Sequence, residues 1–399
     1  MKLFSDFSFH MQTEIVFGKN TETKVGTLIK KHGGTKVLLV VGRGSIYRTG
    51  LYDRVVESLH QAGLPFVGLS GVKANPLRSL TDQGLALAQK EKVDFVLAVG
   101  GGSVIDTAKA IALGMVNDGE YWKFYCGVPV EKTAPVGTIN TISAAGSETS
   151  GSSVLVDDVE SGEKRGFMWD GCKPVFAIMN PELTYSVSPY QTSAGTADIL
   201  AHTVSRYFSP VACKLGDEFG EGLMRSVVKY GPIALEKPND YEARAELMLA
   251  ASFSHNDITG IGRSGPRGGE HDLEQQLSGY YDTAHGAGLA AVMPAWLQYI
   301  VDHCEAEHVN RVAQFGAKVF GADEDFADPK MTANDGLNRF RQWIHAIGMP
   351  LTLKELGIPR EDLQAVIERC LASLPDEMVH GYVPLDRDAV TAIFTSIAE

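Results

Sequence analysis

Short apolar runs alternate with amphipathic stretches in the first half of the chain. Residues 36–41 read Lys-Val-Leu-Leu-Val-Val and residues 94–99 read Asp-Phe-Val-Leu-Ala-Val, which predicts two buried strands. Apolar residues recur at helical spacing over 50–62, 79–91 and 103–114. Shorter apolar runs predict further strands at residues 65–69, 134–137, 153–156 and 175–178. Strands that alternate with helices predict a parallel sheet covered by helices.

The pattern changes after Pro181 and Pro189. Strand-like runs give way to long helical stretches, predicted at residues 191–208, 215–233, 241–255, 286–302, 307–319, 333–346 and 360–373. A length of 399 residues favours two domains that share an interface. We therefore expect an α/β domain over residues 1–187 and an all-helical domain over residues 188–399.

Charge and composition disfavour several kinds of partner. The formal net charge is −13 and the Lys and Arg residues do not cluster, so binding to nucleic acid or to an anionic membrane is not expected. No apolar run approaches the length of a membrane span, and the N-terminus lacks the apolar stretch of a secretory signal. The five cysteines are scattered and form no Cys-x-x-Cys pair, which fits a reducing compartment. We expect a cytoplasmic enzyme.

Four residues of the helical half have the chemistry of a divalent-metal site. Asp198 and His202 are four positions apart, so on a helix their side chains leave the same face. His271 and His285 would lie roughly 21 Å apart on one unbroken helix, whereas a metal–nitrogen bond is about 2.1 Å. A turn over residues 279–284 would let two helix ends converge on one ion. Three imidazoles and a carboxylate suit Fe²⁺ or Zn²⁺, and suit Mg²⁺ or Ca²⁺ poorly.

Each of these residues alone also has an ordinary interpretation. Asp198 and His202 can form an ion pair on a helix surface, worth a few tenths of a kcal/mol. A lone helical histidine is more often a hydrogen-bonded interior residue than a ligand. That ordinary interpretation is kept for the other histidines, which are His10, His32, His60, His255, His303, His308, His345 and His380.

A glycine-rich turn joins the strand at 94–99 to the helix at 103–114. Its residues are Gly100, Gly101, Gly102 and Ser103. Glycine lets the backbone approach a phosphate, and the helix N-terminus offers unpaired N–H groups and the positive end of its dipole. Alternatively, the glycines form a plain tight turn and Ser103 caps the helix. Asp106 and Lys109 can equally be ordinary first-turn residues.

A second turn follows the strand at 36–41 and contains no acidic residue. Its candidate cofactor residues are Gly42, Gly44, Ser45 and Arg48. An acid at such a strand end commonly binds the adenosine ribose, whereas a 2′-phosphate requires a donor or a cation instead. The turn, which also holds Arg43, therefore favours NADP(H) over NAD(H). An ordinary solvated loop is the alternative.

A third segment, residues 138–148, is rich in small hydroxyl-bearing side chains. Its candidate residues are Thr138, Asn140, Thr141 and Ser147. Such side chains suit a loop that lies along the pyrophosphate and the nicotinamide, although a surface turn has the same composition.

Taken together and in this order, these segments resemble the iron-containing (group III) alcohol dehydrogenases. The similarity is greatest to the NADPH-dependent butanol dehydrogenase and aldehyde reductase branch. The matching stretches are residues 100–109, 145–148, 180–183, 197–204 and 277–290. The last stretch is the most specific, because the spacing of His271 and His285 also matches the metal-binding pattern of the family.

The resemblance implies a fold, a reaction and a set of site residues. The fold is an N-terminal α/β domain with a parallel sheet that binds the dinucleotide, followed by a helical domain that binds one divalent metal. The reaction is hydride transfer between NADP(H) and a short- to medium-chain primary alcohol or aldehyde, and a homodimer is the tendency of the family. Asp198, His202, His271 and His285 fall on its metal-ligand positions. Other positions correspond to its cofactor contacts: the pyrophosphate loop at Gly100 to Ser103, the following aspartate at Asp106, the nicotinamide side at Thr138, Thr141 and Lys164, and the 2′-phosphate side at Gly42 and Ser45.

The chain departs from the family pattern at Gln275, where many members carry a further histidine one helical turn after the third ligand. Other activities on the same fold are a polyol dehydrogenase and a lyase of the dehydroquinate synthase type. The lyase would need Lys and Arg residues around the metal, and the nearest basic residues in sequence are Arg206, Arg263 and Arg267. A metal-dependent hydrolase would leave the glycine-rich turns unexplained. A non-catalytic nucleotide-binding module would leave the metal residues unexplained.

Overall fold

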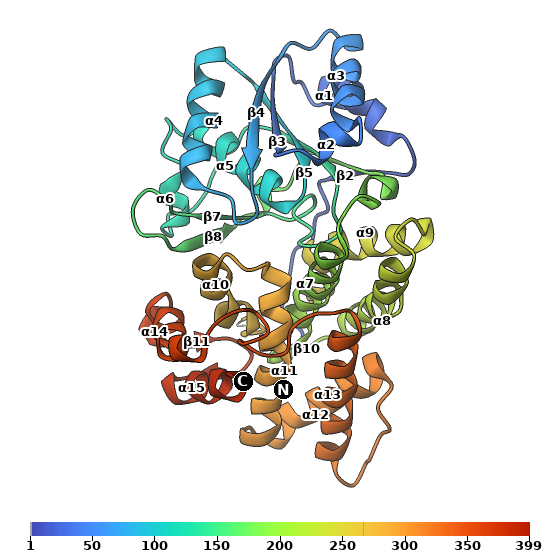
Figure 1. Ribbon diagram of the computed structural model, residues 1–399, viewed down its shortest axis with the longest axis vertical. Helices are drawn as coiled ribbons and strands as arrows, with labels where there is room; N and C mark the ends of the chain where they lie inside the picture. Colours follow the sequence, from blue (N-terminus) through green and yellow to red (C-terminus); the bar gives the residue numbers. More distant parts are fainter. Residues whose placement is uncertain (1, 266) are drawn as a thin grey trace. The chain divides into compact units, whose positions relative to one another are not determined.

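The computed structural model describes residues 2–265 and 267–399, which form two compact units (Figure 1). One unit comprises residues 10–187, and the other comprises Ser188–Glu399 together with the N-terminal residues through Phe9. The N-terminal residues join the second unit because β1 (Lys2–Leu3) pairs in parallel with β10 (Val211–Ala212). The prediction assigned these N-terminal residues to the first domain, 1–187. In the structure, the pairing of β1 with β10 groups them with the helical unit.

A six-stranded sheet organises the unit of residues 10–187. Its strand order is β2-β9-β6-β5-β3-β4 and every pair is parallel, which confirms the predicted parallel sheet. The strands are β2 (Glu14–Phe17), β3 (Val37–Gly42), β4 (Phe66–Val72), β5 (Phe95–Gly100), β6 (Val136–Asn140) and β9 (Phe176–Met179). The helices of this unit are α1 (Val25–Lys31), α2 (Ser45–Arg48), α3 (Leu51–Gln61), α4 (Arg78–Glu91), α5 (Gly102–Val116) and α6 (Trp122–Tyr125), with short 3-10 turns η1 (Thr21–Lys24), η2 (Asp170–Cys172) and η3 (Pro181–Thr184).

The apolar run of β3 is continuous because both faces of the sheet are covered. Val37, Leu39 and Val41 belong to the core cluster that includes α1 and α3. The alternate residues, Leu38 and Val40, belong to the cluster that includes α4 and α5. Successive side chains of a strand point to opposite faces, so a strand with helices on both sides has no polar face. Figure 1 shows α1 and α3 on one side of the sheet and α4 and α5 on the other.

Three of the longer strands differ from the prediction. The predicted strand at 153–156 forms as β7 (Ser152–Val156), but it lies outside the six-stranded sheet and pairs antiparallel with β8 (Lys164–Met168). β2 and β8 were not predicted, because each is short and β8 carries Lys164 and Arg165 within its five residues. The alternation of strand and helix therefore indicates the sheet, but it does not reveal which strands belong to it.

Helices dominate the unit of residues 188–399, as predicted. They are α7 (Pro189–Tyr207), α8 (Lys214–Glu236), α9 (Tyr241–His255), α10 (Glu270–Tyr281), α11 (His285–His303), α12 (Ala306–Phe320), α13 (Pro329–Ala346), α14 (Leu363–Ala372) and α15 (Arg387–Ser396), with 3-10 turns η4 (Ile258–Gly260), η5 (Arg360–Asp362) and η6 (Pro375–Glu377) and a small hairpin of β11 (Val379–His380) and β12 (Pro384–Leu385). Within the described residues, no helix has the length and apolar character that crossing a membrane requires.

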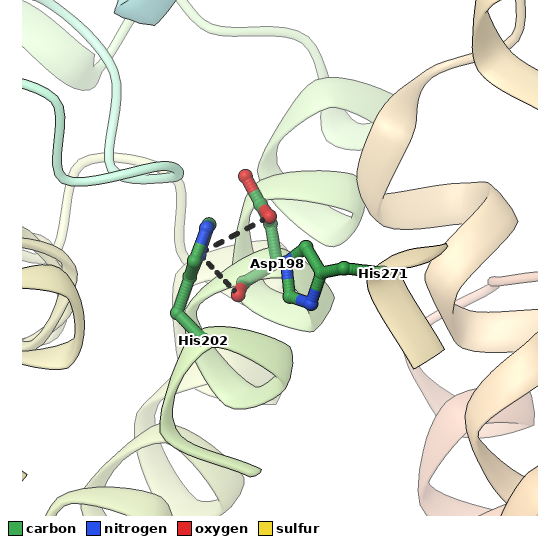
Figure 2. A group of neighbouring side chains, drawn as sticks. All are labelled: Asp198, His202 and His271. Carbon is green, nitrogen blue, oxygen red and sulfur yellow. Dashed lines mark hydrogen bonds and ion pairs between the residues drawn. The ribbon is translucent and has the colours of Figure 1, made fainter. Parts of the chain in front are cut away.

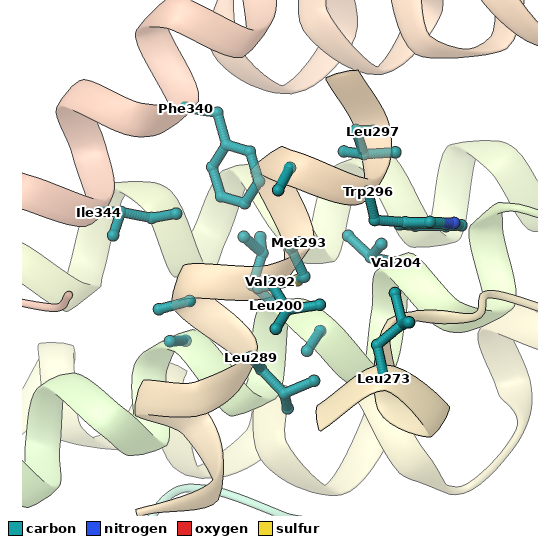
Figure 3. Close-up of a cluster of buried hydrophobic side chains, with 14 of the residues drawn as sticks. Leu200, Val204, Leu273, Leu289, Val292, Met293, Trp296, Leu297, Phe340 and Ile344 are labelled. Atoms are coloured by element: carbon teal, nitrogen blue, oxygen red, sulfur yellow. The ribbon is translucent and has the colours of Figure 1, made fainter. Parts of the chain in front are cut away.

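The core of the helical unit is built around α11 (Figure 3). Leu289, Val292, Met293, Trp296 and Leu297 of α11 are all buried in one cluster. They share that cluster with residues of three neighbouring helices, namely Leu200 and Val204 of α7, Leu273 of α10, and Phe340 and Ile344 of α13. The helices that carry the predicted metal residues are therefore fixed by one common core.

The predicted break between His271 and His285 occurs later than expected. Gly279 to Tyr281 continue α10 instead of forming a turn, and the helix ends where Asp282 adopts a left-handed conformation with φ of 51°. Asp is one of the few residues that tolerates this conformation. α11 then begins at His285, as predicted.

The start of α11 lies very close to α7, and Gly286 permits this approach. A Cβ built on Gly286 would overlap the carbonyl oxygen of Ala194. Gly286→Ala should therefore destabilise the protein by about 1–3 kcal/mol, because the backbones of two packed helices must separate. The matched control is Gly222→Ala on α8, where a Cβ meets only Arg225 at 3.8 Å and alanine should stabilise the helix by roughly 0.5–1 kcal/mol. Urea unfolding of both variants measures the difference, and equal effects would contradict the close approach.

Candidate metal and dinucleotide sites

Asp198 and His202 occupy one buried face of α7. Their exposed fractions are 5% and 6%. The Nδ1 atom of His202 lies 3.0 Å from the backbone carbonyl oxygen of Asp198 and 3.3 Å from its carboxylate (Figure 2). The alternative of a surface ion pair is therefore wrong. Because Nδ1 is turned toward the helix, Nε2 is the nitrogen that remains for a further ligand.

α10 brings His271 to the same place. Asp198, His202 and His271 each offer a ligand atom, and these atoms all lie within 4.8 Å of one another (Figure 2). The rings of His202 and His271 have centroids 4.8 Å apart. Donors that share one ion at about 2.1 Å lie roughly 3–4 Å apart, so small side-chain rotations would bring this group into coordination range.

His285, the fourth predicted ligand, lies beside this group at the first position of α11. Its ring centroid is 5.3 Å from that of His271. The three atoms that converge within 4.8 Å do not include an atom of His285. The structure therefore brings three of the four residues together and leaves the fourth adjacent to them. Gln275, which stands where many family members have a histidine, lies one turn after His271 on α10.

Local electrostatics fit a cation at this place. Burial, helped by the neighbouring rings of His255 and His271, holds the pKa of His202 well below its usual value, and the neutral imidazole is the form that coordinates metals. Burial also acts to lower the pKa of His271, but the hydrogen bond and charge of Glu270 outweigh it and leave that pKa raised. The Nε2 atom of His271 is buried and, within the described residues, has no hydrogen-bond partner. A bound cation would compensate the negative charge of Glu270 and Asp198 and would provide a partner for His271 Nε2.

His255 is a member of this cluster that the sequence did not reveal. Its ring stacks on that of His202, with centroids 4.1 Å apart and planes 23° apart. Arg206 donates a hydrogen bond to the backbone carbonyl of His255 at 3.3 Å. The interpretation of His255 as an ordinary interior histidine overlooked this stacking, because the contact depends on how α9 packs on α7.

Several of the dinucleotide candidates lie where strands of the six-stranded sheet have their carboxyl ends. Val41 pairs with Val99 and Gly100 pairs with Asn140, so the carboxyl ends of β3, β5 and β6 lie side by side. The order of the strands reverses at β3, because β4 lies on one side of it and β5 on the other. The crevice at the carboxyl ends of β3 and β5 is therefore the topological switch point of the sheet. Ligands of open α/β sheets bind at such switch points.

The glycine-rich turn is shaped both by its helix and by a neighbouring loop. Gly101 is the N-cap of α5 and Ser103 lies inside the helix, so the alternative that Ser103 caps α5 is wrong. A Cβ on Gly101 would lie 2.5 Å from the side chain of Ile142. Glycine here leaves the N-terminus of α5 uncovered and also makes room for the loop that follows β6.

Asp106, Lys109 and Ser147 form a polar cluster in which Lys109 and Ser147 are buried, so Asp106 and Lys109 are not ordinary first-turn residues. The Lys109 ammonium donates to the Ser147 carbonyl and hydroxyl and to the carbonyls of Ser150 and Ser152, at 2.7–2.8 Å. Asp106 accepts from the Ser147 hydroxyl at 2.7 Å and from the Val154 amide at 3.2 Å. Burial raises the pKa of Asp106 and lowers that of Lys109 to about 8. The cluster holds the loop of residues 146–152 on α5.

The remaining nicotinamide-side candidates lie in or beside the sheet. Thr138 donates to the Phe176 carbonyl at 3.3 Å, and the Asn140 side chain accepts from the Ile142 amide at 3.2 Å. The Thr141 amide donates to the Gly100 carbonyl at 3.1 Å. Lys164, the first residue of β8, is buried and contributes to the positive charge near Asp106.

The turn after β3 presents two cations and a hydroxyl to solvent. Gly42 ends β3 and Gly44 is the N-cap of the short helix α2. Arg43, Ser45 and Arg48 are exposed. The Arg48 guanidinium folds back over the turn, 3.1 Å from where a Cβ of Gly44 would stand.

Comparison with known proteins identifies the relatives of this chain. Residues 12–181 match the family of iron-containing alcohol dehydrogenases, and residues 192–398 match the C-terminal part of the Fe-containing alcohol dehydrogenase family. The chain is 36% identical to NADH-dependent butanol dehydrogenase A of Clostridium acetobutylicum, covering 97% of this chain and 98% of that protein. It is 30% identical to the NADPH-dependent aldehyde reductase YqhD of Escherichia coli, covering 92% of this chain and 92% of that protein.

Solved structures agree with these sequence matches. The match to the crystal structure of NADH-dependent butanol dehydrogenase A from Thermotoga maritima covers 100% of both chains, with a TM-score of 0.94 and 35% sequence identity. The predicted resemblance and the predicted fold class are thereby confirmed. The relatives are NAD(P)-dependent oxidoreductases of one family. This chain is an oxidoreductase that belongs to the iron-containing alcohol dehydrogenase family.

Proposed function

We propose that the protein transfers hydride between NADP(H) and a short- to medium-chain primary alcohol or aldehyde, with one Fe²⁺ or Zn²⁺ held by Asp198, His202, His271 and His285. The observation that carries this proposal is the convergence of buried nitrogen and oxygen donors from α7 and α10, with His285 of α11 beside them. Such a donor set suits a borderline divalent ion. A bound ion would supply Lewis-acid stabilisation of negative charge on the substrate oxygen during hydride transfer.

The chain's own residues would bind and orient the two reactants. The N-terminus of α5, with Gly100 to Ser103, would hold the pyrophosphate through backbone N–H groups. The Asp106–Lys109–Ser147 cluster would fix the loop that follows β6 beside that helix end. Much of the rate enhancement is expected to come from this orientation of hydride donor and acceptor.

The lyase alternative is disfavoured by the arginines nearest the metal residues. Arg206 and Arg267 both contact the carboxylate of Asp257, at 3.0 and 2.8 Å. Arg263 forms an ion pair with Asp217. These guanidinium groups are already engaged by protein carboxylates, so they do not form the cationic lining that a multiply charged phosphorylated substrate would need.

The preference for NADP(H) is supported by the turn after β3. It lacks an acid and exposes Arg43, Ser45 and Arg48. The relatives differ in the cofactor that their names give: the butanol dehydrogenase is NADH-dependent and the aldehyde reductase is NADPH-dependent.

Ser45→Asp should shift this cofactor preference. The new carboxylate would repel a 2′-phosphate and accept hydrogen bonds from free ribose hydroxyls, so we expect the ratio of kcat/KM for NADPH to that for NADH to fall about 10–100-fold, equivalent to roughly 1.4–2.7 kcal/mol. Thr49→Asp, which adds the same charge at the exposed end of α2, is the matched control. An unchanged ratio in Ser45→Asp would argue against 2′-phosphate binding at this turn.

A direct assay tests the reaction itself. Purified protein loaded with Fe²⁺ or Zn²⁺ is mixed with NADPH and butanal, and the absorbance of the reduced nicotinamide is followed. We expect a loss of absorbance that depends on the metal. If no aldehyde of a chain-length series is reduced with either cofactor and either metal, the proposed reaction is wrong.

The proposal also includes a cytoplasmic homodimer. Its five cysteines are all free thiols, which fits a reducing compartment. Sedimentation equilibrium measures the mass in solution, and a monomeric mass would contradict the proposed dimer.

A further inference from the structure

Two glutamates lie behind the histidines of α10 and α11, at positions that the sequence did not single out. Glu270 and Glu274 are one helical turn apart on α10, and each has an exposed fraction of 0%. A buried carboxylate is costly unless a cation or hydrogen-bond donors compensate for it. Two such groups on one face of one helix therefore need a compensating partner.

Glu270 contacts the imidazole of His271. One carboxylate oxygen of Glu270 lies 2.9 Å from His271 Nδ1 and accepts a short hydrogen bond from the Ser205 hydroxyl of α7. The Ser205 oxygen is itself 2.9 Å from His271 Nδ1. With Nδ1 engaged on this side, the ring presents Nε2 on the other, and Nε2 is the buried nitrogen that has no hydrogen-bond partner within the described residues.

Glu274 makes the equivalent contact with His285, across the break that separates α10 from α11. One of its carboxylate oxygens forms a short hydrogen bond with His285 Nδ1. The carboxylate lies against Gly288 of α11, where a Cβ would overlap it. Gly288 thus makes room for Glu274, and Glu274 ties the ring of His285 to the preceding helix.

We propose that Glu270 and Glu274 are positioning residues, which direct the Nε2 atoms of His271 and His285 toward a shared divalent cation. This inference rests on the metal site of the proposed function. A carboxylate that accepts a hydrogen bond from Nδ1–H fixes both the tautomer and the rotation of a ligating imidazole. Together with Asp198, the pair also places three carboxylates around the site, and this negative charge favours a divalent ion over a monovalent one. Neither glutamate contacts the substrate in this arrangement.

Glu274→Gln tests the proposal by metal affinity. The change keeps the size of the side chain and removes its charge, and we expect about a 10–100-fold weaker affinity of the holoenzyme for Zn²⁺. The measurement is competition between the Zn²⁺-loaded enzyme and a chromophoric chelator, together with the visible spectrum of the Co²⁺-substituted enzyme, whose bands should shift. Affinity for NADPH should not change. The matched control is Glu361→Gln, an identical change at an exposed position of η5.

A double-mutant cycle separates positioning from general structural support. If Glu274 acts through His285, Glu274→Gln should cause no further loss of Zn²⁺ affinity in a His285→Ala background. Fully additive losses would overturn the proposal, as would unchanged Zn²⁺ affinity and an unchanged Co²⁺ spectrum in the single variant. Unfolding of the metal-free proteins checks the fold. Should Glu274→Gln not fold, the same cycle is run with Glu270→Gln and His271→Ala, and the same two results decide.

The affinity measurement does not depend on turnover. Weaker Zn²⁺ binding in the glutamate variants of a protein that reduces no aldehyde would overturn the proposed reaction and support the positioning role. Normal Zn²⁺ binding in variants of an active enzyme would overturn the positioning role alone.

Discussion

His271→Ala should lower kcat/KM for aldehyde reduction by about a thousandfold or more. His271 is the residue that joins α10 to the group on α7, and its loss leaves two of the three converging donors. Lewis-acid stabilisation by a metal is worth several kcal/mol, and each 1.36 kcal/mol is a factor of ten in rate. The affinity for NADPH should change little, because the predicted cofactor residues belong to the other unit. Metal content, nicotinamide fluorescence and steady-state kinetics together measure these effects.

The matched control for this variant is His345→Ala, which removes an exposed histidine from α13. It should retain both metal and activity. The scheme would be contradicted if His271→Ala kept full activity after its metal had been stripped by a chelator.

Lys109→Met should lower the free energy of unfolding by about 3–5 kcal/mol. The substitution removes a fully buried ammonium group whose charge acts on the Asp106 carboxylate, and truncating one member of a buried charged network is usually strongly destabilising. It also removes the donor to three backbone carbonyls of the loop of residues 146–152. Because that loop lies beside the N-terminus of α5, affinity for NADPH should fall as well. Urea unfolding without nucleotide measures the stability, and fluorescence titration measures the binding.

Two further variants separate the loss of the ammonium charge from the loss of packing. Lys90→Met on the exposed face of α4 should change stability by less than about 0.5 kcal/mol. Adding Asp106→Asn to Lys109→Met should restore part of the lost stability, because the uncompensated charge is then gone. A Lys109→Met protein as stable as the unmodified chain would show that the cluster does not hold the loop.

Local sequence patterns were sufficient to predict the main sheet and most of the helices. β3 and β5 are continuous apolar runs because helices cover both faces of the sheet, and that pattern is visible in the sequence alone. The start of α11 at His285 was also predictable, since two ligands so far apart in sequence require a break in the helix. The exact end of α10 was not, because Gly279 is tolerated inside the helix and the left-handed Asp282 ends it.

Contacts between distant segments explain what the sequence did not reveal. Asp106 and Lys109 look like ordinary helix residues until the loop that contains Ser147 folds over them. His255 approaches His202 only through the packing of α9 on α7. Glu270 resembles a common first-turn acid of a helix, and its role depends on Ser205 of α7. In each case the partner lies more than thirty residues away in sequence, where no local periodicity can indicate it.

The candidate metal ligands come from three helices that are joined by one core, and this has a consequence for the order of events during synthesis. Asp198 and His202 leave the ribosome well before His271 and His285, and α7 alone offers only one carboxylate and one imidazole. Tight capture of an ion must therefore wait until α10 and α11 have docked on α7. The apolar core shared by α7, α10 and α11 would therefore bring the ligands together before the ion is bound.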